Sequence, residues 1–241
     1  MIKTKIFLYE FKRIFVSKAY LFLLLLIGAY SVYTLKTVVL RGFADTAPFS
    51  EWSFMNYLFS LAPFLSILLL LYISRLFSPY EKSVMQITSS TSFSGAMYFF
   101  IKLAVITLAY IFAALLVIVA CFMFYALVFD FFNYRIFTIC IGLVLVPQLL
   151  FLQGVGLWVS KLQHNFSFAL IALIFFANFI KLTPPNYLDV LGYSIMQIPQ
   201  NAIPLKGVIP FSVPADFLIS RVVLCVLGIL LIIAGCQKYK Q

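Results

Sequence analysis

Long uncharged apolar runs alternate with short charged segments along the whole chain. A helix needs about 20 apolar residues to cross the hydrocarbon core of a bilayer. Runs that meet this requirement, or come close to it, predict spans over residues 19–40, 52–74, 103–129, 136–160, 163–182 and 217–237. Three of these spans extend beyond the uncharged run and include Lys36, Lys181 and Arg221. The pattern therefore predicts an all-α polytopic membrane protein, a single transmembrane domain over residues 1–241 with six spanning helices and both termini on one side.

Residues 2–18 precede the first predicted span and have a pattern of their own. Phe7, Phe11, Ile14 and Phe15 recur at helical spacing, opposite basic side chains. This pattern predicts an amphipathic helix that lies in the membrane interface, with its aromatic face toward the lipid. A simple basic anchor that sets the topology is the alternative.

Two connecting segments are long enough to have functions beyond joining spans. Residues 79–92 begin at Pro79, where Ser78-Pro79 breaks the second span, and end in a Ser/Thr cluster that can cap or break a helix. We expect a short docking helix there rather than an ordinary loop. Residues 183–216 hold six of the ten prolines between apolar pieces too short to span. Such pieces are typical of an outer re-entrant segment.

Composition excludes a water-soluble protein, because 64% of the 241 residues are hydrophobic and only 10% are charged. The net charge of +10 then indicates a basic cytoplasmic rim rather than a nucleic-acid partner. Eleven of the 17 lysines and arginines fall on the side of the termini. The positive-inside rule therefore places both termini in the cytoplasm.

The chain shows no catalytic or metal-binding motif of its own. It has one histidine and no G-x-x-x-x-G-K-[ST] sequence, so we expect neither a resident metal nor a bound nucleotide. None of the seven acidic residues falls at a predicted bilayer midplane, which disfavours a carrier driven by an ion gradient.

Three amides lie at depth in the predicted spans: Gln148, Gln153 and Asn178. An amide in lipid normally turns inward and bonds to another helix. The same residues are also candidates for lining a translocation path, and the sequence leaves both interpretations open.

The arrangement resembles the membrane subunit of a type-2 ABC exporter, the ABC-2 permease family. Such permeases have six spans, an N-terminal elbow helix similar to residues 2–18, and re-entrant outer helices similar to 183–216. They also carry a cytoplasmic coupling helix, introduced by an acidic residue and followed by a lysine before the third span. Glu81 and Lys102 match these two positions.

The resemblance implies a permease subunit that forms a path as a homo- or heterodimer in a bacterial cytoplasmic membrane. Two copies of a separate ABC ATPase subunit would bind ATP and Mg²⁺ and drive export of an amphipathic peptide, a lipid or a drug. The residues that it implies for ATPase coupling are Glu81, Lys82, Ser83, Met85 and Gln86.

Two other functions stay open. One is a membrane protein that binds a peptide without transporting it, as an immunity protein does. The other is an ion-coupled secondary transporter.

Overall fold

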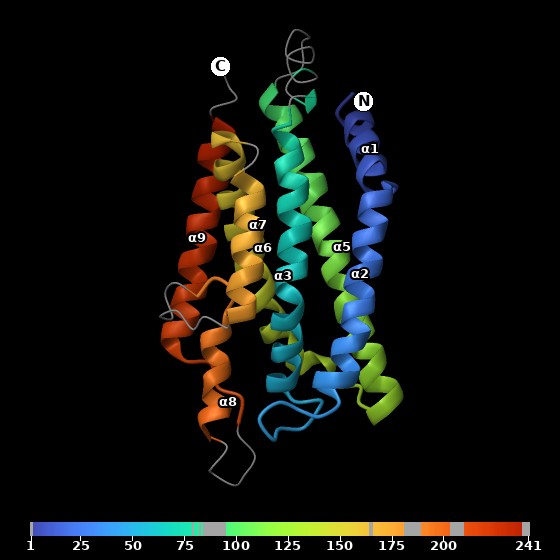
Figure 1. Cartoon of the computed structure of the whole chain (residues 1–241), viewed down its shortest axis with the longest axis vertical. Coiled ribbons are helices and arrows are strands. Elements are labelled where there is room, and N and C mark those ends of the chain that lie inside the picture. The colour runs from blue at the N-terminus through green and yellow to red at the C-terminus, as the bar shows by residue number, and fades with distance from the viewer. Residues whose placement is uncertain are drawn as a thin grey trace.

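Every regular element in the described part of the chain is a helix (Figure 1). The structure is a computed structural model, and it describes residues 2–78, 80–81, 83, 95–163, 166–180, 189–202 and 210–237. The longer helices are α1 (Ile2–Phe15), α2 (Lys18–Thr34), α3 (Glu51–Leu76), α5 (Gly95–Phe129), α6 (Thr138–Leu162), α7 (Phe166–Ile180) and α9 (Ala215–Gln237). The shorter ones are α8 (Gln197–Ala202), the π-helix η1 (Leu35–Val39) and the 3₁₀-helices η2 (Tyr134–Phe137) and η3 (Tyr193–Met196).

Five of these helical segments are long and apolar enough to cross a membrane, and they identify the chain as an integral membrane protein. They cover Lys18–Val39, Glu51–Leu76, Met97–Phe129, Tyr134–Leu162 and Ala215–Gly235. All five coincide with spans that the sequence pattern predicts.

The predicted span 163–182 is only partly present as a helix. It corresponds to α7, whose 15 residues rise about 22 Å, short of the roughly 30 Å of a hydrocarbon core. Residues 164–165 and 181–182 lie outside the described residues. The prediction of six full spans is therefore not confirmed, and the described helices supply five.

The bundle has two distinct ends (Figure 1). The start of α1, the end of α3 and the end of α9 lie together at one end, which we call the α1 end. α8 and the connection between α2 and α3 lie at the other, which we call the α8 end. The two terminal helices thus share an end, as the sequence predicts. α3 lies in the middle of the bundle and is buried along most of its length.

α1 is helical as predicted, but its position differs from the expected interfacial one. Figure 1 shows it running along the long axis of the bundle, above α2, rather than across it. The rings of Phe11 and Phe15 stack 4.1 Å apart, and Phe15 also contacts Tyr20 of α2 and Phe112 of α5. The aromatic face of α1 is therefore partly covered by protein. The expectation of an elbow helix lying flat in the membrane is not supported by this arrangement.

The expected re-entrant segment 183–216 is described over residues 189–202 and 210–216. These residues hold η3, α8 and the first two residues of α9. η3 packs against α3: the Tyr193 hydroxyl donates a hydrogen bond of 3.1 Å to the Phe59 carbonyl. The Phe59 carbonyl lacks its usual hydrogen bond within α3, because the residue four positions later is Pro63, which has no backbone N–H. The described part thus consists of short helices, of which η3 packs against α3 and α8 lies at the end of the bundle, and the re-entrant segment stays a prediction.

The closest helix packing joins α6 and α9 through two glycines. A Cβ atom added at Gly228 would lie 2.5 Å from the backbone of Leu150, and one added at Gly154 would lie 2.8 Å from the carbonyl oxygen of Gly228. The Trp158 indole also donates a hydrogen bond of 3.1 Å to the Leu231 carbonyl. Small residues allow such close approach in lipid, where dispersion replaces the hydrophobic effect between helices.

We expect Gly228→Ala to destabilise the bundle, because its new methyl group would overlap the α6 backbone. Overpacking of this kind costs about 1–3 kcal/mol. Gly235→Ala is the matched control, since a Cβ there would meet its nearest atoms at 3.8 Å, an ordinary contact. Thermal unfolding of both variants in the same detergent measures the difference. Equal midpoints would contradict the close α6–α9 packing.

Candidate functional site

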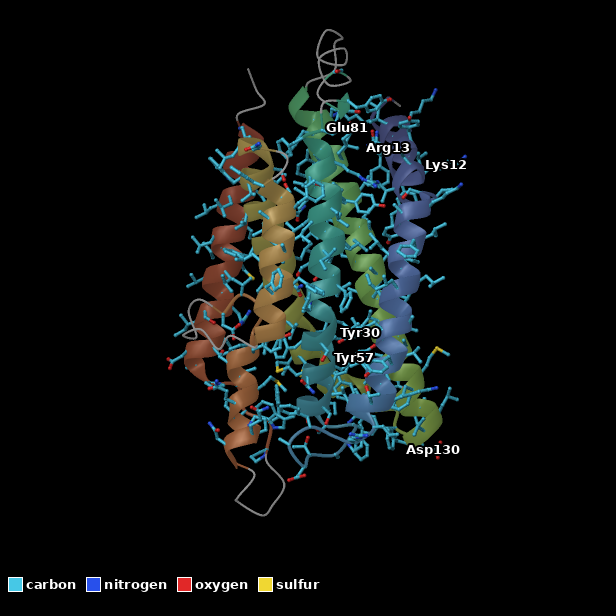
Figure 2. All side chains as sticks on the ribbon, in the orientation of Figure 1. Lys12, Arg13, Tyr30, Tyr57, Glu81 and Asp130 are labelled. Carbon is cyan, nitrogen blue, oxygen red and sulfur yellow. The ribbon has the colours of Figure 1, made fainter. Side chains whose placement is uncertain are left out.

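Four charged side chains from three segments meet at the α1 end, and we call them the charge cluster. Glu10 and Arg13 come from α1, Glu81 from the connection after α3, and Lys102 from α5. Glu10, Lys102 and Glu81 are only 1%, 4% and 6% exposed. Figure 2 shows Arg13 and Glu81 at this end, with Lys12 pointing away from the bundle.

Local structure explains why these side chains converge. Glu10 and Arg13 are three residues apart on α1, so they lie on one face of the helix. The Glu81 backbone amide donates a hydrogen bond of 3.4 Å to the Ser78 hydroxyl. This bond links Glu81 to the residues that directly follow α3. Tyr98 lies one turn before Lys102 on α5, and its ring centre is 4.3 Å from the lysine Nζ.

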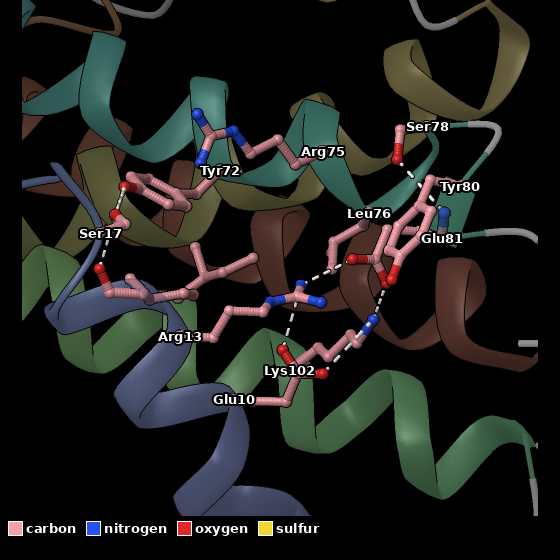
Figure 3. A pocket seen from close by; sticks show the side chains of 12 residues that line it. Glu10, Arg13, Ser17, Tyr72, Arg75, Leu76, Ser78, Tyr80, Glu81 and Lys102 are labelled. Carbon is pink, nitrogen blue, oxygen red and sulfur yellow. Dashed lines mark hydrogen bonds and ion pairs between the residues drawn. The ribbon is translucent and has the colours of Figure 1, made fainter. Parts of the chain in front are cut away.

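The contacts form a closed set of ion pairs (Figure 3). Arg13 Nη2 lies 2.7 Å from Glu81 Oε1 and 3.1 Å from Glu10 Oε2. Lys102 Nζ contacts Glu81 Oε2 directly and lies 3.7 Å from Glu10 Oε1. The Tyr98 hydroxyl donates to Glu10 Oε1 at 3.3 Å. Two carboxylates thus face two cations, and the formal charge of the cluster is zero.

The side chains of the charge cluster can be buried because their formal charges cancel. Removing an ion from water costs several kcal/mol, which close and mutually bonded partners must offset. Burial by itself lowers the pKa of Arg13, but the carboxylates of Glu10 and Glu81 outweigh it and raise this pKa above its ordinary value. The guanidinium therefore stays charged at any pH that the fold survives. The cluster ties α1, α5 and the α3–α5 connection into one unit.

A cleft of about 380 Å³ opens beside the cluster, between α1, α3 and α5 (Figure 3). Its walls carry both charged and apolar side chains. They are Glu10, Arg13, Ile14, Ser17, Tyr72, Arg75, Leu76, Ser78, Tyr80, Glu81, Lys102 and Ile106.

The structure brings together the two residues that carry the family resemblance. Glu81 and Lys102 are 21 positions apart in sequence and form a direct ion pair. Ser83 is exposed, whereas Lys82, Met85 and Gln86 lie outside the described residues. A coupling helix over 79–92 is therefore not confirmed.

Sequence reasoning missed Glu10 and Arg13 as members of this site. The signal for them was present, because Glu10 is the one acidic residue in an otherwise basic amphipathic segment, 2–18. An acid placed three residues before an arginine on such a helix indicates an ion pair. It does not indicate which distant residues complete it.

The amides at depth tie helices together. Gln148 donates to the Ala62 carbonyl at 2.5 Å and to the Ser66 hydroxyl at 2.6 Å, which joins α6 to α3. Gln153 donates to the Thr107 hydroxyl at 2.9 Å, which joins α6 to α5. Both contacts favour the structural interpretation over a translocation path. Asn178 belongs to α7, and its side chain lies outside what the structure describes.

A second polar centre, which sequence reasoning also missed, lies near the start of α9. Arg221 is 2% exposed and donates to the carbonyls of Asp189 at 2.5 Å and Val190 at 3.0 Å. The Asp189 carboxylate accepts from the backbone amides of Gly192 and Ser194 at 2.6 and 2.5 Å. These contacts of Arg221 fasten the segment before η3 to α9.

Comparisons of the chain with protein-family models, with characterised proteins and with solved structures find no match. Among the described residues, no group of three or more His, Cys, Asp or Glu side chains could hold a metal ion. The charge cluster and its cleft are therefore the site on which a functional proposal depends.

We expect a double-mutant cycle on Glu81 and Lys102 to show strong coupling. Either Glu81→Gln or Lys102→Gln alone leaves charged partners unbalanced in a buried site, at a cost of about 3 kcal/mol. The double variant restores neutrality. Its loss of stability should therefore be smaller, by about 1 kcal/mol or more, than the sum of the losses in the two single variants. Thermal or denaturant unfolding in detergent gives the four values. Simple additivity would show that the pair does not act as a unit.

Proposed function

We propose that this chain is the permease subunit of an ATP-driven exporter of the ABC-2 type. In this proposal the α1 end faces the cytoplasm and the chain pairs with a second permease subunit, identical or related. Two copies of an ABC ATPase subunit bind at the α3–α5 connection and supply ATP and Mg²⁺ chemistry. The cargo is an amphipathic peptide, a lipid or a drug.

The charge cluster is the observation that carries the proposal. Glu81 lies in the connection on which the family receives its ATPase, and its carboxylate is held by Arg13 of α1 and Lys102 of α5. A displacement of the connection would have to carry both helices with it, since separating the charges leaves buried ions unpaired. The cluster thus supplies a mechanical link from a docking segment to the bundle.

Ion coupling within the chain has less support. The buried charges described so far lie near helix ends, in the charge cluster at the α1 end and around Arg221 near the start of α9. At depth, the described polar contacts are amides and hydroxyls that bond to neighbouring helices. An energy source on a partner subunit fits this distribution.

We expect Ser83→Trp to weaken ATPase binding about tenfold or more without unfolding the bundle. Ser83 is exposed in the connection, so a bulky side chain there would collide with a docked subunit. The measurement is purification of the tagged chain from its native host in mild detergent, with mass spectrometry of the subunits retained. A retained subunit with a Walker A motif, lost in the variant, is the expected result.

Ala47→Trp is the matched control, because Ala47 is exposed in the connection at the α8 end. It should retain the ATPase subunit as the wild type does. Recovery of a folded chain alone at every detergent strength would contradict the proposal and favour a non-transporting peptide-binding protein. Transport that an uncoupler abolishes, with no ATPase present, would favour an ion-coupled carrier.

A further inference from the structure

Arg75 lies in the last turn of α3 and lines the cleft beside the charge cluster. Figure 3 shows its side chain turned away from Glu81, toward Tyr72 and Ser17. The guanidinium carbon lies 5.0 Å from the centre of the Tyr72 ring. None of the ion pairs among the described residues includes Arg75. Because the charge cluster neutralises itself, Arg75 gives the cleft a net positive charge.

The cleft also has an apolar lining. Ile14, Leu76 and Ile106 contribute to it, from α1, α3 and α5 respectively. A second hollow of about 290 Å³ adjoins the cleft at Arg13 and Ser17, and it is also lined by the exposed Lys12. A cation beside an apolar wall suits a ligand with an anionic head and a hydrocarbon tail. The 380 Å³ of the cleft falls in the range of ligand pockets, about 300–1,000 Å³.

The position of Arg75 along α3 indicates that such a ligand comes from the lipid bilayer. α3 has 26 residues and rises about 39 Å, longer than the roughly 30 Å hydrocarbon core and close to the 40–45 Å that includes the headgroups. Its last turn therefore reaches headgroup level. An arginine there meets lipid phosphates, for which its planar fork of donors is well suited.

We propose that this cleft binds the headgroup of an anionic phospholipid from the leaflet at the α1 end. The phosphate lies against Arg75, with Lys12 adding longer-range attraction, and the glycerol and acyl carbons lie against Ile14, Leu76 and Ile106. The contact between Arg75 and Tyr72 holds the guanidinium at the cleft. The site does not depend on the exporter proposal, since it requires neither an ATPase nor transport.

Native mass spectrometry of the detergent-purified full chain tests the site with two lipids, dioleoyl phosphatidylglycerol and dioleoyl phosphatidylcholine. We expect the wild type to prefer the anionic lipid and Arg75→Gln to bind it about fivefold more weakly, as the loss of one basic group at a membrane surface predicts. Arg75→Lys should retain most of the preference. Binding of the zwitterionic lipid should not change.

Arg41→Gln is the matched control, because Arg41 is an exposed arginine in the α2–α3 connection at the α8 end. It should leave the lipid preference intact, and far-ultraviolet circular dichroism should show equal helicity for all variants. Equal losses in Arg75→Gln and Arg41→Gln, or no preference in the wild type, would overturn the site. Displacement of the lipid by millimolar inorganic phosphate would assign the cleft to a free anion instead.

Discussion

The structure of the α1 end depends on ion pairs that neutralise charged side chains buried away from water. Glu10, Glu81 and Lys102 are almost fully buried, and their contacts with one another, with Arg13 and with Tyr98 make this possible. Each carboxylate touches both cations, so no member can leave without exposing the others to an apolar setting. This constraint joins α1 and α5 to Glu81 in the connection after α3.

Elsewhere the bundle is held by weaker and more numerous interactions. α6 is the helix that binds several others, through Gln148 to α3, Gln153 to α5 and the glycine contact to α9. Each of these bonds contributes modestly, because an unfolded helix in lipid also finds polar partners.

The sequence predicts the helices well because span length and hydropathy are local properties. Five spans and the helix over Ile2–Phe15, most of the predicted segment 2–18, follow from them. The sequence predicts the site less well, because its members are distant in the chain. Glu81 and Lys102 could be singled out by a resemblance, but their partners Glu10 and Arg13 could not. The burial of Arg221 against the carbonyls of Asp189 and Val190 could not be predicted, because contacts between distant residues leave no periodic pattern in the sequence.

Placing Arg75 beside a neutral cluster has a further physical consequence. In a cleft whose charges balanced completely, the attraction for a lipid headgroup or a soluble anion would not exceed the cost of removing that anion from water. One surplus arginine at headgroup level changes that balance, and it does so next to the residues that hold α1 against α5. In the proposed site, an anionic headgroup at Arg75 would share the cleft with Arg13 and Glu81, which also line it. If both proposals hold, lipid binding at Arg75 and displacement of Glu81 act on residues of the same cleft.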